Sequence, residues 1–161
     1  MAEGEFALVK DHLETAGKLP VSSRGFLMNE TERYFLLADL AVLERDEVAL
    51  HHYAPLTEET AARDGHLLFQ ASSHRAWGVL HRLEGNYEEA EARLNQALEM
   101  FQKLETRWQM GRTLFELAEL ALAQTNTAKA RDYFSRALAA YEEMKAVPDA
   151  ARTRAALEAL K

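Results

Sequence analysis

The segment WGVLHRLEGNYEEAEARLNQALEMF, residues 77–101, returns forty residues later as LAELALAQTNTAKARDYFSRALAAY, residues 117–141. The two copies agree in where they place turn-forming, small and large residues. Gly85-Asn86 aligns with Thr125-Asn126, Ala90 with Ala130, Leu94 with Phe134, and Ala97 with Ala137. Self-similarity at a fixed period of this size is typical of repeat architectures built from one supersecondary unit.

The same period continues on both sides of this segment. Small residues recur at Ala38, Gly78 and Ala118. Each stands between two rows of large apolar residues that lie three apart and therefore form one buried helix face. Small residues there allow two helix axes to approach closely, and hairpins that cannot bury both faces alone stack into a solenoid. The two rows are Leu37, Trp77, Leu117 and Leu157, and Leu40, Leu80, Leu120 and Leu160.

Helical periodicity covers nearly the whole chain, and no β-branched alternating segment of strand length occurs. The pattern predicts an all-α, right-handed α-solenoid of about eight helices in antiparallel pairs. Asn29 and Asp46 are predicted N-caps, and Asp64-Gly65 a helix end. Pro55 predicts a kink or break within a helix that reaches about Arg63. Val147-Pro148-Asp149 predicts a break before a last helix, and residues 21–25 a loop.

These features resemble the tetratricopeptide repeat over about residues 30–161. The resemblance rests on the small residue of the first helix, on the turn Gly85-Asn86-Tyr87, and on the spacing of Ala90, Leu94 and Ala97 in the second helix. It implies one domain over 1–161, with a leftover helix at 3–17, a degenerate repeat at 29–64, repeats at 66–104 and 106–145, and a capping helix at 149–161. The forty-residue period is similar to the C-terminal arrays of bacterial signal-transducing ATPases and LuxR-like regulators.

The last copy of the repeat differs at one telling position. Glu158 stands where the earlier copies have a small residue. A carboxylate there would be buried beneath a further hairpin, but it is readily solvated on a terminal cap. We therefore expect the last helix to keep one face in water and the array to end with it.

The composition excludes several classes of protein. There are 19 Lys+Arg, 26 Asp+Glu and no Cys, for a net charge of −7. Non-specific nucleic-acid binding needs clustered positive charge, so we predict no nucleic-acid partner. Residues 1–64 contain 6 basic and 13 acidic residues, whereas residues 65–161 contain 13 of each. The acidic part is either a solvated surface or a surface that meets a basic partner.

The residues that could perform chemistry do not form a recognisable motif. His74 and His81 are two helical turns apart and His51 and His52 are adjacent, whereas zinc sites favour His at i, i+4. No nucleophile elbow or phosphate-binding glycine loop is present. We predict no catalytic, cofactor or metal site. The acidic N-terminus lacks an apolar signal region, and no apolar segment could span a membrane, so we expect a cytoplasmic protein with no membrane partner.

The resemblance implies a concave groove lined by the first helix of each pair. By register, the groove residues are Phe35, Asp39, Val42, Arg75, Val79, Arg82, Arg112, Phe115, Glu119, Leu122 and Arg152, with Ser72 beside them. Arginine suits bidentate contact with carboxylates. The alternative is that these arginines pair within the chain with Asp39, Glu116 and Glu119. The family's chaperone-tail clamp needs asparagines that are missing at the matching positions.

The leading functional hypothesis is a non-enzymatic adaptor that holds a peptide or helix of a partner protein in this groove. The first alternative is a homo-oligomer that associates through exposed apolar residues of the end helices, such as Phe6 and Val9. The second is a small-ligand sensor, which would need a closed pocket. The partner itself cannot be inferred from these residues.

Overall fold

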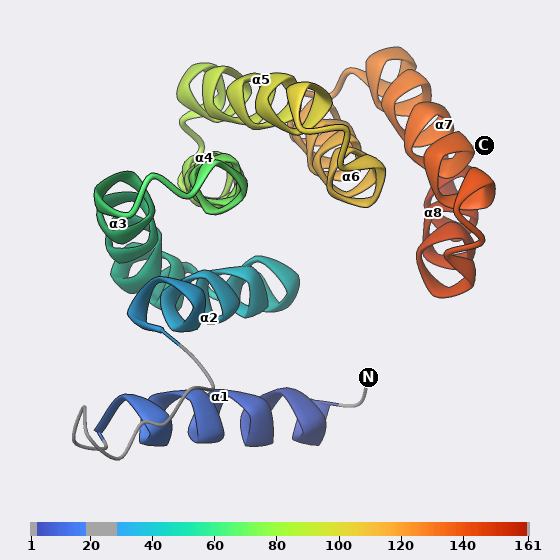
Figure 1. Ribbon diagram of the computed structural model, residues 1–161. Helices are drawn as coiled ribbons and strands as arrows, with labels where there is room; N and C mark the ends of the chain where they lie inside the picture. Colours follow the sequence, from blue (N-terminus) through green and yellow to red (C-terminus); the bar gives the residue numbers. More distant parts are fainter. Residues whose placement is uncertain (1–2, 19–28, 161) are drawn as a thin grey trace. The chain divides into compact units, whose positions relative to one another are not determined.

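The computed structural model describes residues 3–18 and 29–160 of the chain. Within them it contains eight α-helices and no strand, as predicted (Figure 1). The predicted loop at 21–25 lies outside the described residues. The helices are α1 (Glu3–Lys18), α2 (Glu30–Glu44), α3 (Glu47–Arg63), α4 (Leu67–Leu83), α5 (Tyr87–Lys103), α6 (Arg107–Ala123), α7 (Thr127–Glu143) and α8 (Val147–Ala159).

The turns between consecutive helices, from α2 through α8, recur every twenty residues, which is half of the forty-residue sequence period. Each turn has one residue with a positive φ, and these are Arg45, Gly65, Gly85, Glu105, Thr125 and Lys145. The next N–H then bonds back to the helix, as in His66 N→Ala61 O at 2.9 Å and Asn86 N→His81 O at 2.8 Å. This is the Schellman arrangement, which satisfies carbonyls that a helix end leaves open. Two turns use Gly, and the other four hold a side chain in the left-handed region.

Local capping explains where α2 and α3 begin. Asn29 accepts a hydrogen bond from the N–H of Glu32 at 2.7 Å, and Asp46 accepts one from the N–H of Ala49 at 3.0 Å. Both predicted N-caps are therefore confirmed. The hydrogen bond from the Ala49 N–H is the main reason why the pKa of Asp46 lies below its usual value, because it stabilises the charged carboxylate.

Of the kink or break predicted at Pro55, the break is wrong, and so is the break predicted at Val147-Pro148-Asp149. The helix α3 continues through Pro55, whose side chain is exposed. The buried residues Leu50, Ala54 and Thr57 of α3 hold the segment together by tertiary packing, which outweighs the hydrogen bond that proline removes. Val147 and Pro148 form the first turn of α8 instead of a break, because the first turn of a helix tolerates proline.

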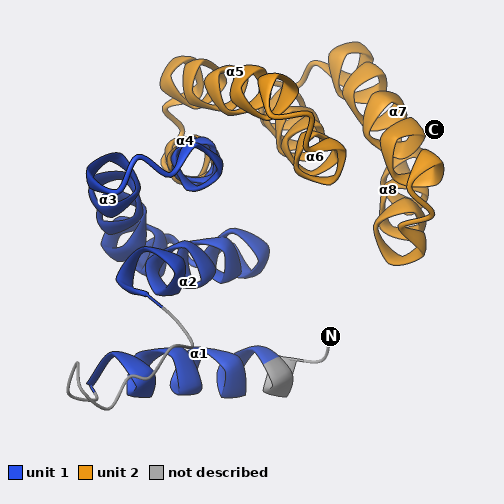
Figure 2. Cartoon of the chain, in the orientation of Figure 1, with its two compact units in different colours: residues 1–76 blue, residues 77–161 orange. Residues whose placement is uncertain are grey.

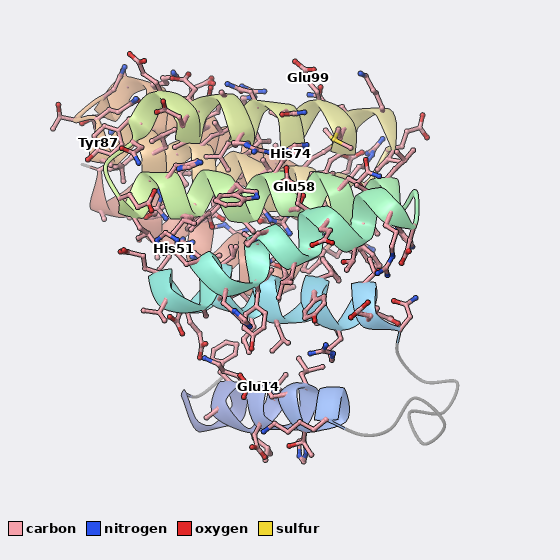
Figure 3. All side chains as sticks on the ribbon, turned by 90° about the vertical axis from the view of Figure 1, so that its left-hand side faces the viewer. Glu14, His51, Glu58, His74, Tyr87 and Glu99 are labelled. Carbon is pink, nitrogen blue, oxygen red and sulfur yellow. The ribbon has the colours of Figure 1, made fainter. Side chains whose placement is uncertain are left out.

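The chain separates into two compact units, unit 1 with residues 1–76 and unit 2 with residues 77–161 (Figure 2). In unit 1, α2 packs on α3, and α1 packs on α2. Leu13 is buried, and Glu14 on α1 accepts a hydrogen bond from the hydroxyl of Tyr53 at 3.0 Å (Figure 3). Burial, reinforced by Glu14, raises the pKa of Tyr53 to about 12. Lys10 also bonds to the carboxylate of Asp46.

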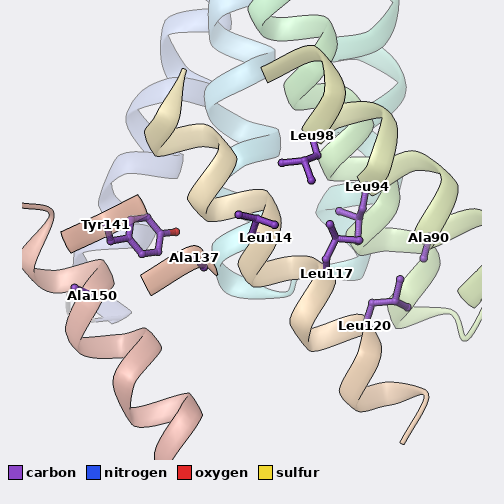
Figure 4. Close-up of a cluster of buried hydrophobic side chains, with 9 residues drawn as sticks. All are labelled: Ala90, Leu94, Leu98, Leu114, Leu117, Leu120, Ala137, Tyr141 and Ala150. Atoms are coloured by element: carbon purple, nitrogen blue, oxygen red, sulfur yellow. The ribbon is translucent and has the colours of Figure 1, made fainter. Parts of the chain in front are cut away.

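The core of unit 2 joins α5, α6, α7 and α8 (Figure 4). Its buried cluster consists of Ala90, Leu94, Leu98, Leu114, Leu117, Leu120, Ala137, Tyr141 and Ala150. Ala90, Leu94, Leu117, Leu120 and Ala137 of this cluster are the small and large residues that repeat in the sequence. A Cβ added at Gly78 would lie 2.6 Å from Cγ of Leu94 and 3.2 Å from the carbonyl oxygen of Ala90. The expected close approach at the small positions is thus present between α4 and α5.

Candidate functional site

All eleven predicted groove residues lie on α2, α4, α6 and α8, the first helices of the pairs. The unit boundary within α4 divides them into two groups. Unit 1 holds Phe35, Asp39, Val42 and Arg75, and unit 2 holds Val79, Arg82, Arg112, Phe115, Glu119, Leu122 and Arg152. Each group is therefore described as a surface of its own unit.

Five of the predicted residues are buried. Their exposed fractions are 2% for Val42, 1% for Arg75, 0% for Val79, 7% for Arg112 and 6% for Phe115. These side chains offer almost no surface to a partner in this structure. Partner contact therefore remains a prediction for the six residues with accessible side chains. These are the half-buried Phe35, Asp39, Arg82, Glu119 and Leu122 and the exposed Arg152.

In unit 1, an ion pair and an aromatic stack connect α2 with α4. Arg75 Nη2 lies 2.8 Å from Asp39 Oδ1, and the two side chains are 1% and 17% exposed. Phe35 stacks on Phe69 with ring centroids 4.5 Å apart, and His66 stacks on Phe69 at 3.9 Å. The alternative that Arg75 pairs within the chain is confirmed. The arginine holds two helices together through a buried charge pair.

In unit 2, the arginines of this surface have different surroundings. Arg82 Nη2 lies 3.3 Å from Glu116 Oε2, with both side chains largely buried, so the intramolecular alternative is confirmed here as well. The guanidinium of Arg152 instead lies over the ring of Phe115, 4.1 Å from its centroid. That of Arg112 lies 4.8 Å from the ring centroid of Trp108.

An apolar cluster supports the Phe115 ring. Phe115 meets Phe134 of α7 edge to face, with centroids 5.0 Å apart and the rings inclined at 68°. Ala118 completes this buried cluster, and half-buried residues of α6, α7 and α8 pack against it. Those residues are Leu122, Tyr133, Ala156, Leu157 and Leu160. We name Arg152, Phe115, Leu122, Ala156 and Leu157 the α6–α8 face.

Sequence reasoning missed two aromatic residues of these surfaces. Phe69 was not singled out because it lies in the first turn of α4, outside the forty-residue register that relates Phe35 to Arg75. Trp108 is 44% exposed and donates a hydrogen bond from its indole N–H to Asp149 at 3.1 Å. Trp108 lies in the first turn of α6, outside the apolar rows of the repeat. A large aromatic residue at such a position could have been recognised in the sequence as a surface residue.

Three open pockets in unit 2 lie away from the predicted groove residues. One of about 570 Å³ is lined by Gln102, Glu105, Arg107, Met110, Ala140 and Glu143, and Arg107 pairs with Glu143 beside it. One of about 430 Å³ lies between α7 and α8 and includes Tyr141, Val147 and Arg154. A third of about 290 Å³ is lined by residues of the same two helices. None of the three is the closed cavity that a small-ligand sensor needs.

Within residues 3–18 and 29–160, no three His, Cys, Asp or Glu side chains are grouped so that they could hold a metal ion. In the same part of the chain, no helix is both long enough and apolar enough to cross a membrane.

Comparison with known families identifies the repeat. The model of the tetratricopeptide repeat matches residues 69–143, which run from the start of α4 to the end of α7. These residues match the tetratricopeptide repeat over slightly less than half of the chain. The match covers the segment in which the forty-residue period is clearest, so the resemblance to tetratricopeptide repeats that the sequence suggested is confirmed.

The fold extends this similarity to the rest of the chain. A crystal structure of a Rap protein complexed with competence and sporulation factor matches 98% of this chain with a TM-score of 0.82 and 17% sequence identity. The match covers 44% of the Rap chain, so the present chain spans less than half of its length. No curated protein matches the sequence significantly. The chain is an all-α helical repeat of the tetratricopeptide type, a fold typical of non-enzymatic protein-interaction scaffolds.

Proposed function

We propose that the chain is a non-enzymatic adaptor that binds a peptide or helix of a partner protein on the exposed surfaces of its first helices. The single observation that carries this proposal is the tetratricopeptide match over residues 69–143. Exposed and half-buried aromatic, aliphatic and arginine side chains on α2, α6 and α8 support it, because such residues dominate binding energy at protein interfaces. We place its action in the cytoplasm.

The Rap protein with the similar fold is complexed with competence and sporulation factor, and that complex supports the proposal that a helical repeat of this shape binds a partner. We also keep the repeat division at 29–64, 66–104 and 106–145, with a cap at 149–161, as part of the proposal. The turns at twenty-residue intervals from Arg45 to Lys145 support that division.

A capture experiment with two substitutions on α6 and one control charge reversal on α5 tests the adaptor function. The tagged chain is used to capture proteins from a lysate, and bound proteins are identified by mass spectrometry. Glu119→Lys and Leu122→Ser alter the first-helix surface of α6, whereas Glu99→Lys makes the same charge change on the exposed side of α5 (Figure 3). We expect Glu99→Lys to retain the partner and the two α6 variants to lose it. Retention of every partner by both α6 variants would remove the basis of the proposal.

Self-association is the second candidate, and one observation favours it. Val9, predicted as an association residue, is 44% exposed and its neighbour Leu8 is 58% exposed, whereas the other predicted residue, Phe6, is half-buried. Light scattering over a range of concentrations tests it, with Val9→Asp as the comparison. A mass equal to one chain at the highest concentration would exclude this candidate.

A further inference from the structure

We propose that the α6–α8 face of unit 2 recognises an acidic segment of the partner, with Arg152 binding a carboxylate and the neighbouring apolar side chains receiving an adjacent aliphatic or aromatic residue. This inference rests on the proposed adaptor function and specifies the chemistry of the peptide. It follows from three features of the described residues: the position of Arg152, the lack of an internal counter-ion and the apolar surroundings.

The Phe115 ring holds the Arg152 side chain in a defined position. The guanidinium lies 4.1 Å from the ring centroid, and Phe115 is itself fixed edge to face against the fully buried Phe134. A guanidinium that lies against an aromatic ring keeps its N–H donors in a planar fork that matches a carboxylate. Because the ring already restricts the side chain, less conformational entropy is lost when the fork binds a ligand.

Arg152 differs from its neighbours in having no carboxylate partner within the described chain. Glu116 is engaged by Arg82, and Arg154, two residues away on the same helix, bonds to Glu142 at 2.6 Å. Glu119, the other acidic side chain on this surface of α6, forms no ion pair with a described residue. Arg152 is exposed, so its guanidinium remains available to a carboxylate from outside.

The surroundings of Arg152 select the rest of the ligand. Leu122, Ala156 and Leu157 are half-buried and pack against the cluster of Phe115, Ala118 and Phe134. They form an apolar surface beside the guanidinium, and such a surface favours a peptide in which Leu, Ile or Phe stands next to Asp or Glu. Residues 65–161 contain equal numbers of acidic and basic residues. A polyphosphate or nucleic acid needs a cluster of cations, so a single carboxylate is the better ligand.

Peptide display provides the test, and three proteins are compared. A library of random peptides is selected in parallel on the wild-type chain, on Arg152→Gln and on the matched control Arg154→Gln. The control makes the same charge change on the same helix, at an arginine that already has a partner. Both positions are exposed, so both variants should fold like the wild type, which circular dichroism verifies.

We expect wild type and Arg154→Gln to select peptides enriched in Asp or Glu next to Leu, Ile or Phe, and Arg152→Gln to lose the acidic enrichment. For the strongest selected peptide, measured by fluorescence anisotropy, we expect Arg152→Gln to weaken binding by roughly 10- to 100-fold, as for a lost charged hydrogen bond. Arg152→Lys should give an intermediate affinity because it keeps the charge without the planar fork. Arg154→Gln should stay within about twofold of the wild type.

The outcomes separate this inference from the function on which it rests. If the wild type selects peptides without acidic enrichment, or if Arg152→Gln binds them equally well, the chain still binds peptides but the Arg152 assignment is wrong. If the two arginine variants weaken binding equally, the effect reflects overall charge and the assignment is also wrong. If the wild type selects no peptide, the proposed peptide-binding function fails together with the inference.

Discussion

Adding one methyl group at Gly78 tests which effect decides the residue type at the small position of the repeat. The two effects are the close approach of the helices and the helix propensity of the residue. Gly78 lies within α4, and alanine is favoured over glycine inside a helix by about 1 kcal/mol. The new Cβ would lie 2.6 Å and 2.8 Å from Cγ and Cδ2 of Leu94, and 3.2 Å from the carbonyl oxygen of Ala90. Leu94 is fully buried, so it has little space into which it can move.

Overpacking of this kind costs about 1–3 kcal/mol, which exceeds the gain in propensity at most sites. We therefore expect Gly78→Ala to lower the free energy of unfolding of unit 2 by up to about 2 kcal/mol, the excess of that cost over the propensity gain. Hydrogen exchange of the α4–α5 amides in unit 2 is the suitable assay, because it reports the stability of this unit separately from unit 1. Urea denaturation followed by circular dichroism provides a second measurement.

The repeat supplies a matched control. Ala118 occupies the equivalent position one period later and is fully buried against the Phe134 cluster. Ala118→Gly should also destabilise unit 2, by about 1 kcal/mol, because it loses propensity without relieving a contact. Opposite substitutions at equivalent positions should thus both be destabilising. If Gly78→Ala instead stabilised the chain by the amount that Ala118→Gly loses, the packing argument would be refuted.

Three further predictions concern the turns, the buried ion pair and the docking of α1. Gly85→Ala should destabilise the chain by about 1 kcal/mol through backbone strain alone, because no atom lies within 4 Å of the new Cβ. Thr125→Gly at the equivalent turn should be neutral or stabilising by up to about 1 kcal/mol, and thermal denaturation compares the two. Asp39→Ala should cost about 3–5 kcal/mol because it leaves the charge of Arg75 buried, and urea denaturation should show that Arg75→Met in the same chain recovers part of this loss. The raised pKa of Tyr53, about 12, means that its contribution to stability is complete below pH 10 and disappears as the pH rises to 12. The difference in melting temperature between wild type and Tyr53→Phe should therefore shrink over that interval.

Each of these predictions has an outcome that contradicts it. Equal effects of the two turn substitutions would mean that the left-handed backbone is not strained at Thr125. A loss below about 1 kcal/mol for Asp39→Ala would show that other contacts of Arg75, or water, compensate its charge when the carboxylate is gone. A difference between wild type and Tyr53→Phe that stays constant up to pH 12 would mean that the phenol is solvated and that Tyr53 does not help to hold α1.

The elements of this fold were predictable because the signals that define them are local. The caps Asn29 and Asp46 act on N–H groups three residues away, and the end at Gly65 depends on its own backbone conformation. The prediction of a break at Pro55 failed for the opposite reason. Whether Pro55 interrupts α3 depends on packing against another helix, and no window around the proline contains that information.

The candidate site was predictable only in its register. The resemblance, read in the forty-residue register, placed all eleven residues on first helices, where the structure has them, but it could not distinguish Arg75 from Arg152. Both occupy first helices, yet one is 1% exposed and paired and the other is exposed and lies on an aromatic ring. The partner of Arg75 is 36 residues away in the sequence, and that of Arg82 is 34 residues away.

By itself, then, the amino-acid sequence determined the helices, the forty-residue period and the resemblance to the repeat family, because these depend on periodicity and capping within a few residues. Only the tertiary structure decided which charged side chains are used inside the protein and which remain on its surface. Burial and pairing depend on atoms that come from other helices, and a guanidinium finds its counter-ion only after those helices have packed.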